Sequence, residues 1–144
     1  MTVRENLELG AFTLSKPAAA EALDRVLAQF PLLAAKLAML AGNMSGGEQQ
    51  ILETAMVLES GPTLLLLDEP SLGLSPGNQE QVFATIAELR GRGLTVLVVE
   101  QNAHGALGIS DIGIVMELGR LFAMGPAQEI LHDPRIKLAY LGGG

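Results

Sequence analysis

The chain has 144 residues, of which 49% are hydrophobic and 17% charged, a composition typical of a packed globular protein rather than a disordered one. The net charge is −7 and the Lys and Arg residues are scattered, which argues against a nucleic-acid partner because nucleic-acid binders usually carry a basic patch. The sequence has no Cys, so it offers neither a disulfide framework nor a thiolate metal site. No apolar run approaches the roughly 18 residues of a membrane-spanning helix, and we expect a soluble, cytoplasmic chain.

The first part of the sequence predicts helices. Pro17 suits a first helical turn, and Pro31 suits a break between two helices. Apolar residues recur at steps of three and four, which predicts one buried helical face: Leu23, Val26, Leu27, Phe30, Leu33, Leu37 and Leu40. We expect residues 1–60 to form a helical subdomain that ends in a helix from Gly46 to Glu59.

From residue 61 onward the pattern changes to alternating strands and helices. The continuous apolar runs Thr63–Asp68 and Thr95–Glu100 predict parallel strands that are buried on both faces. A helix from Ser75-Pro76 to Arg90 would join them as a right-handed crossover. The remaining expected elements are a short helix near Ala103–Leu107, strands near Ile112–Glu117 and Arg120–Ala123, and short helices after Pro126 and Pro134. Residues 61–144 therefore read as part of an α/β core.

Two adjacent carboxylates follow the first of these strands. Asp68 and Glu69 would lie at the carboxyl edge of the sheet, where open parallel sheets bind ligands. Successive strand residues point to opposite faces, so the two side chains should do different work. One can hold Mg²⁺, usually through water, and the other can orient an attacking water. The plainer alternative is a strand that ends in a polar turn at Pro70.

A second motif begins the helix that precedes this strand. Ser45 and Glu48 match a capping box at a helix N-terminus. Gly46 and Gly47 leave room for a phosphate, and a helix N-terminus offers free N–H groups to an anion. An ordinary capped helix would explain Ser45 and Glu48, but it would not explain two helix-weakening glycines in the first turn.

In combination these motifs resemble those of the ATP-binding subunits of ABC transporters. Ser45–Gln49 resembles their signature motif, Leu64–Glu69 their Walker B strand, and Ser71–Leu74 their D-loop. The resemblance is strongest to the subunits that energise branched-chain amino acid uptake, and it rests on these segments: Glu48–Gln50, Ser71–Leu74, Val99–Asn102, Thr2–Leu7 and Ala139–Gly143.

The resemblance implies a partial P-loop nucleoside-triphosphatase fold and a role for each motif residue. Asp68 would help to hold Mg²⁺, Glu69 would act as the catalytic base, and Gln101 would occupy the place of a switch histidine. Ser45, Gly46 and Gly47 would contact the γ-phosphate of ATP bound by the opposite subunit, and Glu48 and Gln49 would belong to the same ATP-binding signature motif. Ser71 and Gly73 would belong to a loop that communicates across the dimer.

The same resemblance implies the partners and the place of action. The partners would be a second ABC ATP-binding subunit and membrane permease subunits. Through the permease, the chain would lie on the inner face of the plasma membrane. ATP and Mg²⁺ would be the cofactors of the complete dimer.

The sequence departs from the family pattern in three ways. Met44 stands where the signature usually opens with Leu, and Met56 stands where family members often carry Arg. The sequence also contains no G-x-x-x-x-G-K-[ST] loop, whose backbone N–H groups and Lys cradle the phosphates in this family. We therefore interpret the chain as a C-terminal portion of such a subunit, and we expect it to be inactive alone.

Two alternatives remain open from the sequence. The chain could be a non-catalytic module that offers its signature face to ATP held by a loop-bearing ABC subunit. It could also come from an ABC-type ATPase outside transport, although such proteins usually carry long coiled-coil or basic insertions and none is visible here.

Overall fold

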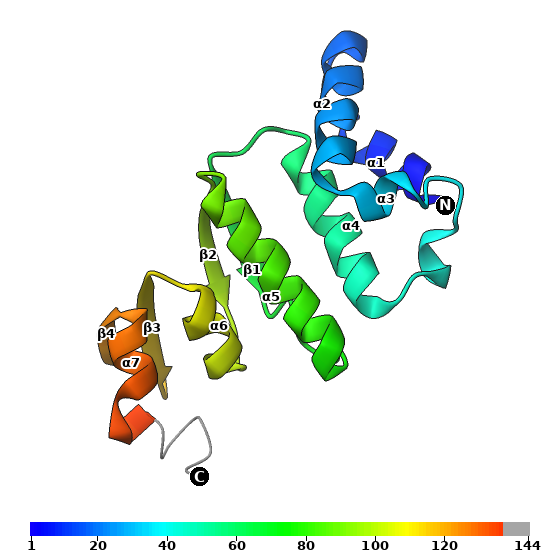
Figure 1. The fold of residues 1–144 in the computed structure, drawn as a ribbon. Helices are drawn as coiled ribbons and strands as arrows, with labels where there is room; N and C mark the ends of the chain where they lie inside the picture. Colours follow the sequence, from blue (N-terminus) through cyan, green and yellow to red (C-terminus); the bar gives the residue numbers. More distant parts are fainter. Residues whose placement is uncertain (137–144) are drawn as a thin grey trace. The chain divides into compact units, whose positions relative to one another are not determined.

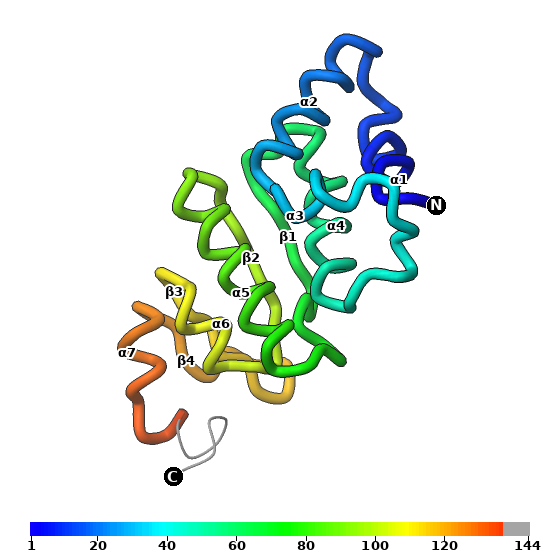
Figure 2. Tube along the Cα trace, turned by 45° about the vertical axis from the view of Figure 1, so that its right-hand side comes forward, coloured from blue at the N-terminus to red at the C-terminus, as the bar shows by residue number. Residues whose placement is uncertain are grey.

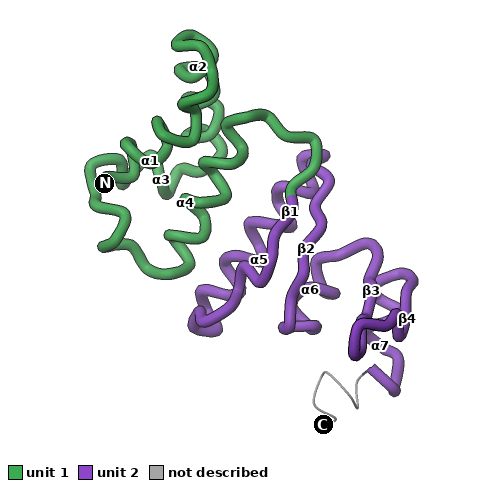
Figure 3. Tube along the Cα trace, turned by 180° about the vertical axis from the view of Figure 1, so that it is seen from behind, with its two compact units in different colours: residues 1–65 green, residues 66–144 purple. Residues whose placement is uncertain are grey.

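The computed structural model describes residues 1–136, and the chain divides into two compact units, residues 1–65 and 66–144 (Figure 3). The similarity noted at Ala139–Gly143 lies outside the described residues. Each unit has its own packed elements.

The first unit is built from helices (Figure 1). Its elements are α1 (Val3–Gly10), α2 (Lys16–Gln29), α3 (Pro31–Ala34), the 3₁₀ turn η1 (Ala41–Asn43) and α4 (Gly46–Leu58). Thr2 and Glu5 form a capping box that starts α1. Pro17 lies in the first turn of α2, and Pro31 begins α3 after a break at Phe30, both as the sequence predicts.

The apolar stripe of the first unit packs into its core only in part. Val26, Phe30 and Leu33 are buried, but Leu40 is 53% exposed, so the predicted burial of Leu40 is wrong. The stripe does not follow one continuous helix because the chain leaves the helical path after α3. Leu40 instead forms an antiparallel bridge with Thr2.

Helices α1 and α4 approach closely at Gly10. A Cβ atom at Gly10 would lie 2.8 Å from Oε2 of Glu59 and 2.9 Å from the carbonyl oxygen of Met56. Glu59 is only 1% exposed, and within residues 1–136 neither of its carboxylate oxygens has a hydrogen-bond partner. Arg25 donates to the backbone carbonyl of Glu59 at 3.1 Å rather than to its carboxylate. The first unit thus buries a carboxylate that has no hydrogen-bond partner among residues 1–136.

This buried acid predicts a pH-dependent stability. Burial raises the pKa of Glu59 from 4.5 to about 7, and the charge of Arg25 lowers it only in part. Because the folded pKa lies above the unfolded one, the unfolded chain loses its proton first as pH rises. The free energy of unfolding should therefore fall by at most about 3 kcal/mol between about pH 4.5 and 7, then level off.

Glu59→Gln should remove this slope, as measured by urea unfolding at several pH values. Glu53→Gln is the matched control because Glu53 is exposed on the same helix. An unchanged pH slope in Glu59→Gln would contradict the assignment.

In its described part, up to residue 136, the second unit combines two small sheets with three helices. Its elements are β1 (Leu64–Asp68), which starts just before the unit boundary, α5 (Pro76–Gly91), β2 (Thr95–Val99), α6 (Ala103–Ile109), β3 (Ile112–Glu117), β4 (Arg120–Pro126) and α7 (Ala127–His132). Strands β1 and β2 form a parallel pair connected through α5, and β3 pairs with β4 in an antiparallel hairpin. Helix α7 packs on this hairpin (Figure 2).

Among residues 66–136, two apolar clusters stabilise the second unit. In the first, Val82, Phe83 and Ile86 of α5 pack with partly buried residues that include Leu67 and Val96. The second cluster joins α6 and α7 through Leu107, Ala127, Ile130 and Ile136. Among the helices of residues 1–136, none combines the length and the apolar character needed to cross a membrane.

The strands of the parallel pair are not buried on both faces, so that prediction is wrong. Leu67 and Val96 pack against the α5 cluster, whereas Leu66 is 65% exposed, Leu97 54% and Val99 56%. The continuous apolar run indicates a strand that could be covered twice, but within the described residues only one face packs into the clusters. The other face is an exposed apolar surface.

This surface predicts self-association of the isolated chain. Light scattering should give masses above the 15.1 kDa of one chain, because exposed apolar strands pair readily. Leu97→Thr should reduce the association because it replaces an exposed apolar side chain by a polar one, and the β-branched threonine suits a strand. Leu9→Thr, which changes an exposed leucine of α1, should leave the association unchanged. A monodisperse monomer of the unmodified chain would contradict this expectation.

Candidate functional site

The turn after β1 positions the two predicted carboxylates. Asp68 is the last residue of β1 and is exposed. Glu69 leaves the strand with φ of 47°, a left-handed conformation that is uncommon for residues other than glycine. The N–H of Glu69 donates to the carbonyl of Val99 at 2.8 Å, which fixes this turn against the end of β2. Because the strand ends at Asp68, the strand alternation that the sequence argument used does not extend to Glu69.

The structure brings Glu69 and Gln101 together. Nε2 of Gln101 donates to Oε1 of Glu69 at 2.7 Å. Gln101 and its neighbour Glu100 also help to line a cavity of about 650 Å³ between β2, α6 and β3. An amide can donate one hydrogen bond and accept another, so Gln101 can orient this carboxylate without titrating near neutral pH.

The loop after the carboxylates is tied to the segment that follows β2. The N–H of Ser71 donates to Oε1 of Glu100 at 2.7 Å, and Gly73 adopts φ of 73°, which favours glycine. Nε2 of Gln79 donates to the carbonyls of Ser71 and Leu74, each at 3.3 Å. Sequence reasoning assigns no role to Glu100 or Gln79. For Glu100, the sequence signal was a carboxylate directly after a strand, which is the same pattern that singles out Glu69.

The signature helix begins with the capping box that the sequence predicts. The N–H of Glu48 donates to Oγ of Ser45 at 3.3 Å, and the N–H of Ser45 donates to Oε2 of Glu48 at 3.2 Å. Nζ of Lys36 donates to Oε1 of Glu48 at 2.6 Å, and this contact is the largest cause that lowers the pKa of Glu48. Nε2 of Gln49 donates to the carbonyl of Met44 at 3.1 Å. The N-terminus of α4 is therefore held by side chains of the helix itself and by Lys36, which precedes it in the sequence.

The N-terminus of α4 is partly exposed to solvent. Ser45 and Gly46 are exposed, whereas Gly47 is buried. These residues belong to the first compact unit, and Asp68, Glu69, Ser71, Gly73 and Gln101 belong to the second. The structure thus assembles the predicted site residues in two local groups, one in each unit.

The carboxylates present fit a magnesium site that is completed by water and phosphate oxygens, rather than one made of protein ligands alone. Within residues 1–136 there is no group of three or more His, Cys, Asp or Glu side chains that could hold a metal ion. Mg²⁺ usually takes one or two carboxylates and fills its other positions with water and phosphate oxygens. An exposed Asp68 at the end of a strand is compatible with that arrangement.

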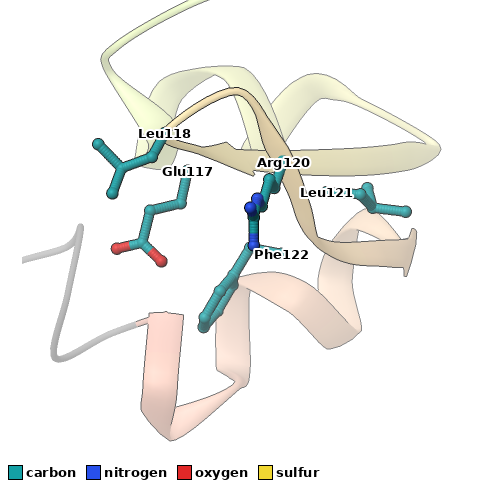
Figure 4. Close-up of a pocket in the computed structure, with 5 residues that line it drawn as sticks. All are labelled: Glu117, Leu118, Arg120, Leu121 and Phe122. Carbon is teal, nitrogen blue, oxygen red and sulfur yellow. The ribbon is translucent and has the colours of Figure 1, made fainter.

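A separate cavity of about 440 Å³ lies at the β3–β4 hairpin (Figure 4). It is lined by Glu117, Leu118, Arg120, Leu121 and Phe122. Glu117 and Arg120 are cross-strand partners, and the turn residue Leu118 is 97% exposed. None of the predicted site residues lines this cavity.

The profile of the ABC transporter family matches residues 1–72, which is half of the chain. The chain therefore belongs to the ABC transporter family, and its architecture is a partial P-loop nucleoside-triphosphatase fold.

The relatives include two ATP-binding proteins of amino acid transport. The chain is 46% identical to the high-affinity branched-chain amino acid transport ATP-binding protein BraG of Pseudomonas aeruginosa, over 99% of the chain and 61% of that protein. It is 39% identical to the probable branched-chain amino acid transport ATP-binding protein LivF of Archaeoglobus fulgidus, with the same coverage. The ADP conformation of MJ1267, an ATP-binding cassette of an ABC transporter, superposes with a TM-score of 0.82 at 26% identity, over 99% of the chain and 63% of that structure. The chain spans less than two thirds of the length of these relatives.

Proposed function

We propose that this chain contributes the signature helix and the hydrolytic carboxylates of the ATP-binding subunit of an ABC importer for branched-chain amino acids. The observation that carries the proposal is the 2.7 Å hydrogen bond between Gln101 and Glu69 at the adjoining ends of β1 and β2. It supports a carboxylate with a fixed orientation at the sheet edge where a triphosphate would lie. The similarity to BraG and LivF supports the substrate class.

Three candidate residues of the second unit then have distinct chemical roles. Glu69 orients the attacking water and accepts its proton through the oxygen that Gln101 leaves free. Gln101 fixes the rotamer of that carboxylate through its amide group. Asp68 would help to hold Mg²⁺, which would neutralise charge on the phosphates.

The signature helix acts on a different nucleotide. Gly46 presents its N–H group and the positive end of the α4 dipole, and Ser45 presents its hydroxyl group, to the γ-phosphate of ATP bound in a second ATP-binding subunit. Glu48 and Gln49 hold the shape of this tip through the hydrogen bonds described above. Permease subunits complete the importer and place the chain on the cytoplasmic face of the membrane.

The 144-residue chain alone should bind MgATP weakly. Its sequence offers no G-x-x-x-x-G-K-[ST] loop, and each charge-assisted hydrogen bond of such a loop contributes about 1.5–3 kcal/mol. Asp68 and Glu69 cannot replace these bonds because they are negative like the ligand. Equilibrium binding of a fluorescent ATP analogue with Mg²⁺, measured beside a loop-bearing ABC subunit, tests this. Micromolar affinity of the chain alone would contradict it.

Pairing with a loop-bearing ABC subunit should depend on ATP. This experiment also tests the second candidate function, a non-catalytic module that supplies only its signature face, which the exposed tip at Ser45 and Gly46 favours. A pull-down with and without MgATP should retain the chain only with nucleotide. Gly46→Glu should abolish retention because it sets a negative charge against the phosphate, although an acid in the first turn suits the helix.

The control for this pull-down is Gly42→Glu. Gly42 is exposed in η1, and a Cβ atom there would meet nothing within 4 Å, so the same charge enters the same unit outside the motif. Loss of pairing in both variants would show a general charge effect. Absence of pairing by the unmodified chain would count against both functions, whereas ATP hydrolysis that requires Glu69 in the paired complex would favour the enzyme over the module.

A further inference from the structure

Glu100 satisfies a backbone group that has no access to water. Ser71 is only 2% exposed, and its N–H donates to Oε1 of Glu100 at 2.7 Å. The second oxygen of Glu100 lies 3.4 Å from the N–H of Asn102 and accepts from it. One carboxylate thus joins the start of the Ser71–Leu74 loop to the segment after β2. The distance of 2.7 Å is typical of a charge-assisted hydrogen bond.

A second tie runs parallel to the first. Gln79 of α5 donates to the carbonyls of Ser71 and Leu74, and its Oε1 accepts from Nδ2 of Asn102 at 3.1 Å. Oδ1 of Asn102 in turn accepts from the N–H of Gly105 at 3.0 Å and caps α6. Both ends of the loop are therefore fastened, through side chains, to the residues that flank Gln101.

We propose that Glu100 is a positioning residue that makes the Ser71–Leu74 loop and Gln101 move together. Glu100 and Gln101 are consecutive, and they bind in two directions, Glu100 to Ser71 and Gln101 to Glu69. A displacement of the loop moves Glu100 through its hydrogen bond to Ser71. Because Gln101 is the next residue, its side chain then shifts and changes the orientation of Glu69. This inference rests on the proposed function for the idea that the loop faces a second subunit.

The chemistry of the side chain makes the proposal specific. An ionised carboxylate accepts from two N–H groups at once, here those of Ser71 and Asn102. In Glu100→Gln, the amide oxygen keeps the bond to Ser71, and the NH₂ group turns a donor toward Asn102. In Glu100→Ala, the buried N–H of Ser71 loses its partner.

The first experiment measures the coupling between the Ser71–Leu74 loop and Gln101 in the absence of nucleotide. Hydrogen exchange at the amide of Ser71 and the NMR resonance of the Gln101 side-chain amide are recorded for the unmodified chain, Glu100→Ala and Glu100→Gln. In Glu100→Ala, exchange at Ser71 should rise roughly tenfold or more, and the Gln101 resonance should move. Glu100→Gln should restore most of both. Amides of the α7 cluster, such as that of Ile130, should keep their rates.

Glu88→Ala is the matched control. Glu88 lies in the same unit and binds Arg92 on the exposed side of α5, so its loss should change neither Ser71 nor Gln101. Faster exchange throughout residues 66–136 in Glu100→Ala, or an unmoved Gln101 resonance, would overturn the proposal and leave Glu100 a structural residue. If Glu100→Ala does not fold, Gln79→Met breaks the second tie, and an unmoved Gln101 resonance in that variant would overturn the proposal equally.

The second experiment separates this inference from the proposed function. ATP-dependent pairing with a loop-bearing subunit should weaken about tenfold or more in Glu100→Ala and recover in Glu100→Gln. Unimpaired pairing of Glu100→Ala would overturn the positioning role. Failure of the unmodified chain to pair would overturn the proposed function, and the exchange and resonance data would still decide whether Glu100 couples the loop to Gln101.

Discussion

The hydrogen bond from the N–H of Glu69 to the carbonyl of Val99 is the interaction on which the candidate site depends. It closes the end of β1 onto the end of β2 and holds Glu69 in a left-handed conformation, whose cost of about 1–3 kcal/mol the surrounding contacts must offset. The turn that results sends the chain toward the segment after β2. Only then can Glu69 reach Gln101 and Ser71 reach Glu100.

The start of α4 is also held in a fixed conformation, here by side-chain contacts rather than by pairing between strands. Gly46 and Gly47 each weaken a helix by about 1 kcal/mol, so the start of α4 needs compensation. A capping interaction contributes about 0.5–2 kcal/mol, and here Glu48 also binds Lys36 at 2.6 Å. These contacts offset the cost of the glycines, which keep the tip free of bulky side chains. Loss of the Lys36 contact would leave Glu48 with the capping box alone.

The parts of the fold that follow from short-range rules could be predicted from the sequence. Helix α4 begins at Gly46, as its capping box indicates, and the Thr2–Glu5 capping box of α1 carries the same readable pattern. Strand β3 spans Ile112–Glu117, as its apolar run predicts. Helix α5 begins at Pro76 because Ser75 and Pro76 mark its N-terminus.

Features that depend on contacts distant in sequence could not be predicted. The left-handed Glu69 depends on Val99, thirty positions later, and nothing local marks it. Glu59 looks like a residue at an exposed helix end, yet the close approach of α1 at Gly10 buries it. The continuous apolar runs of β1 and β2 do not show which face is exposed, because such a run indicates what a strand can bury and not what covers it.

The described contacts also explain why Asp68 differs from the other candidate residues. Glu69 is oriented by Gln101, Ser71 by Glu100 and Glu48 by Lys36, so each of these groups is set before any ligand arrives. The side chain of Asp68 has no hydrogen-bond or ion-pair partner among residues 1–136. A carboxylate that approaches a cation through a water molecule needs freedom to adapt to that shell, whereas a base must aim at one proton. The fixed Glu69 and the free Asp68 therefore match the two different tasks proposed for them.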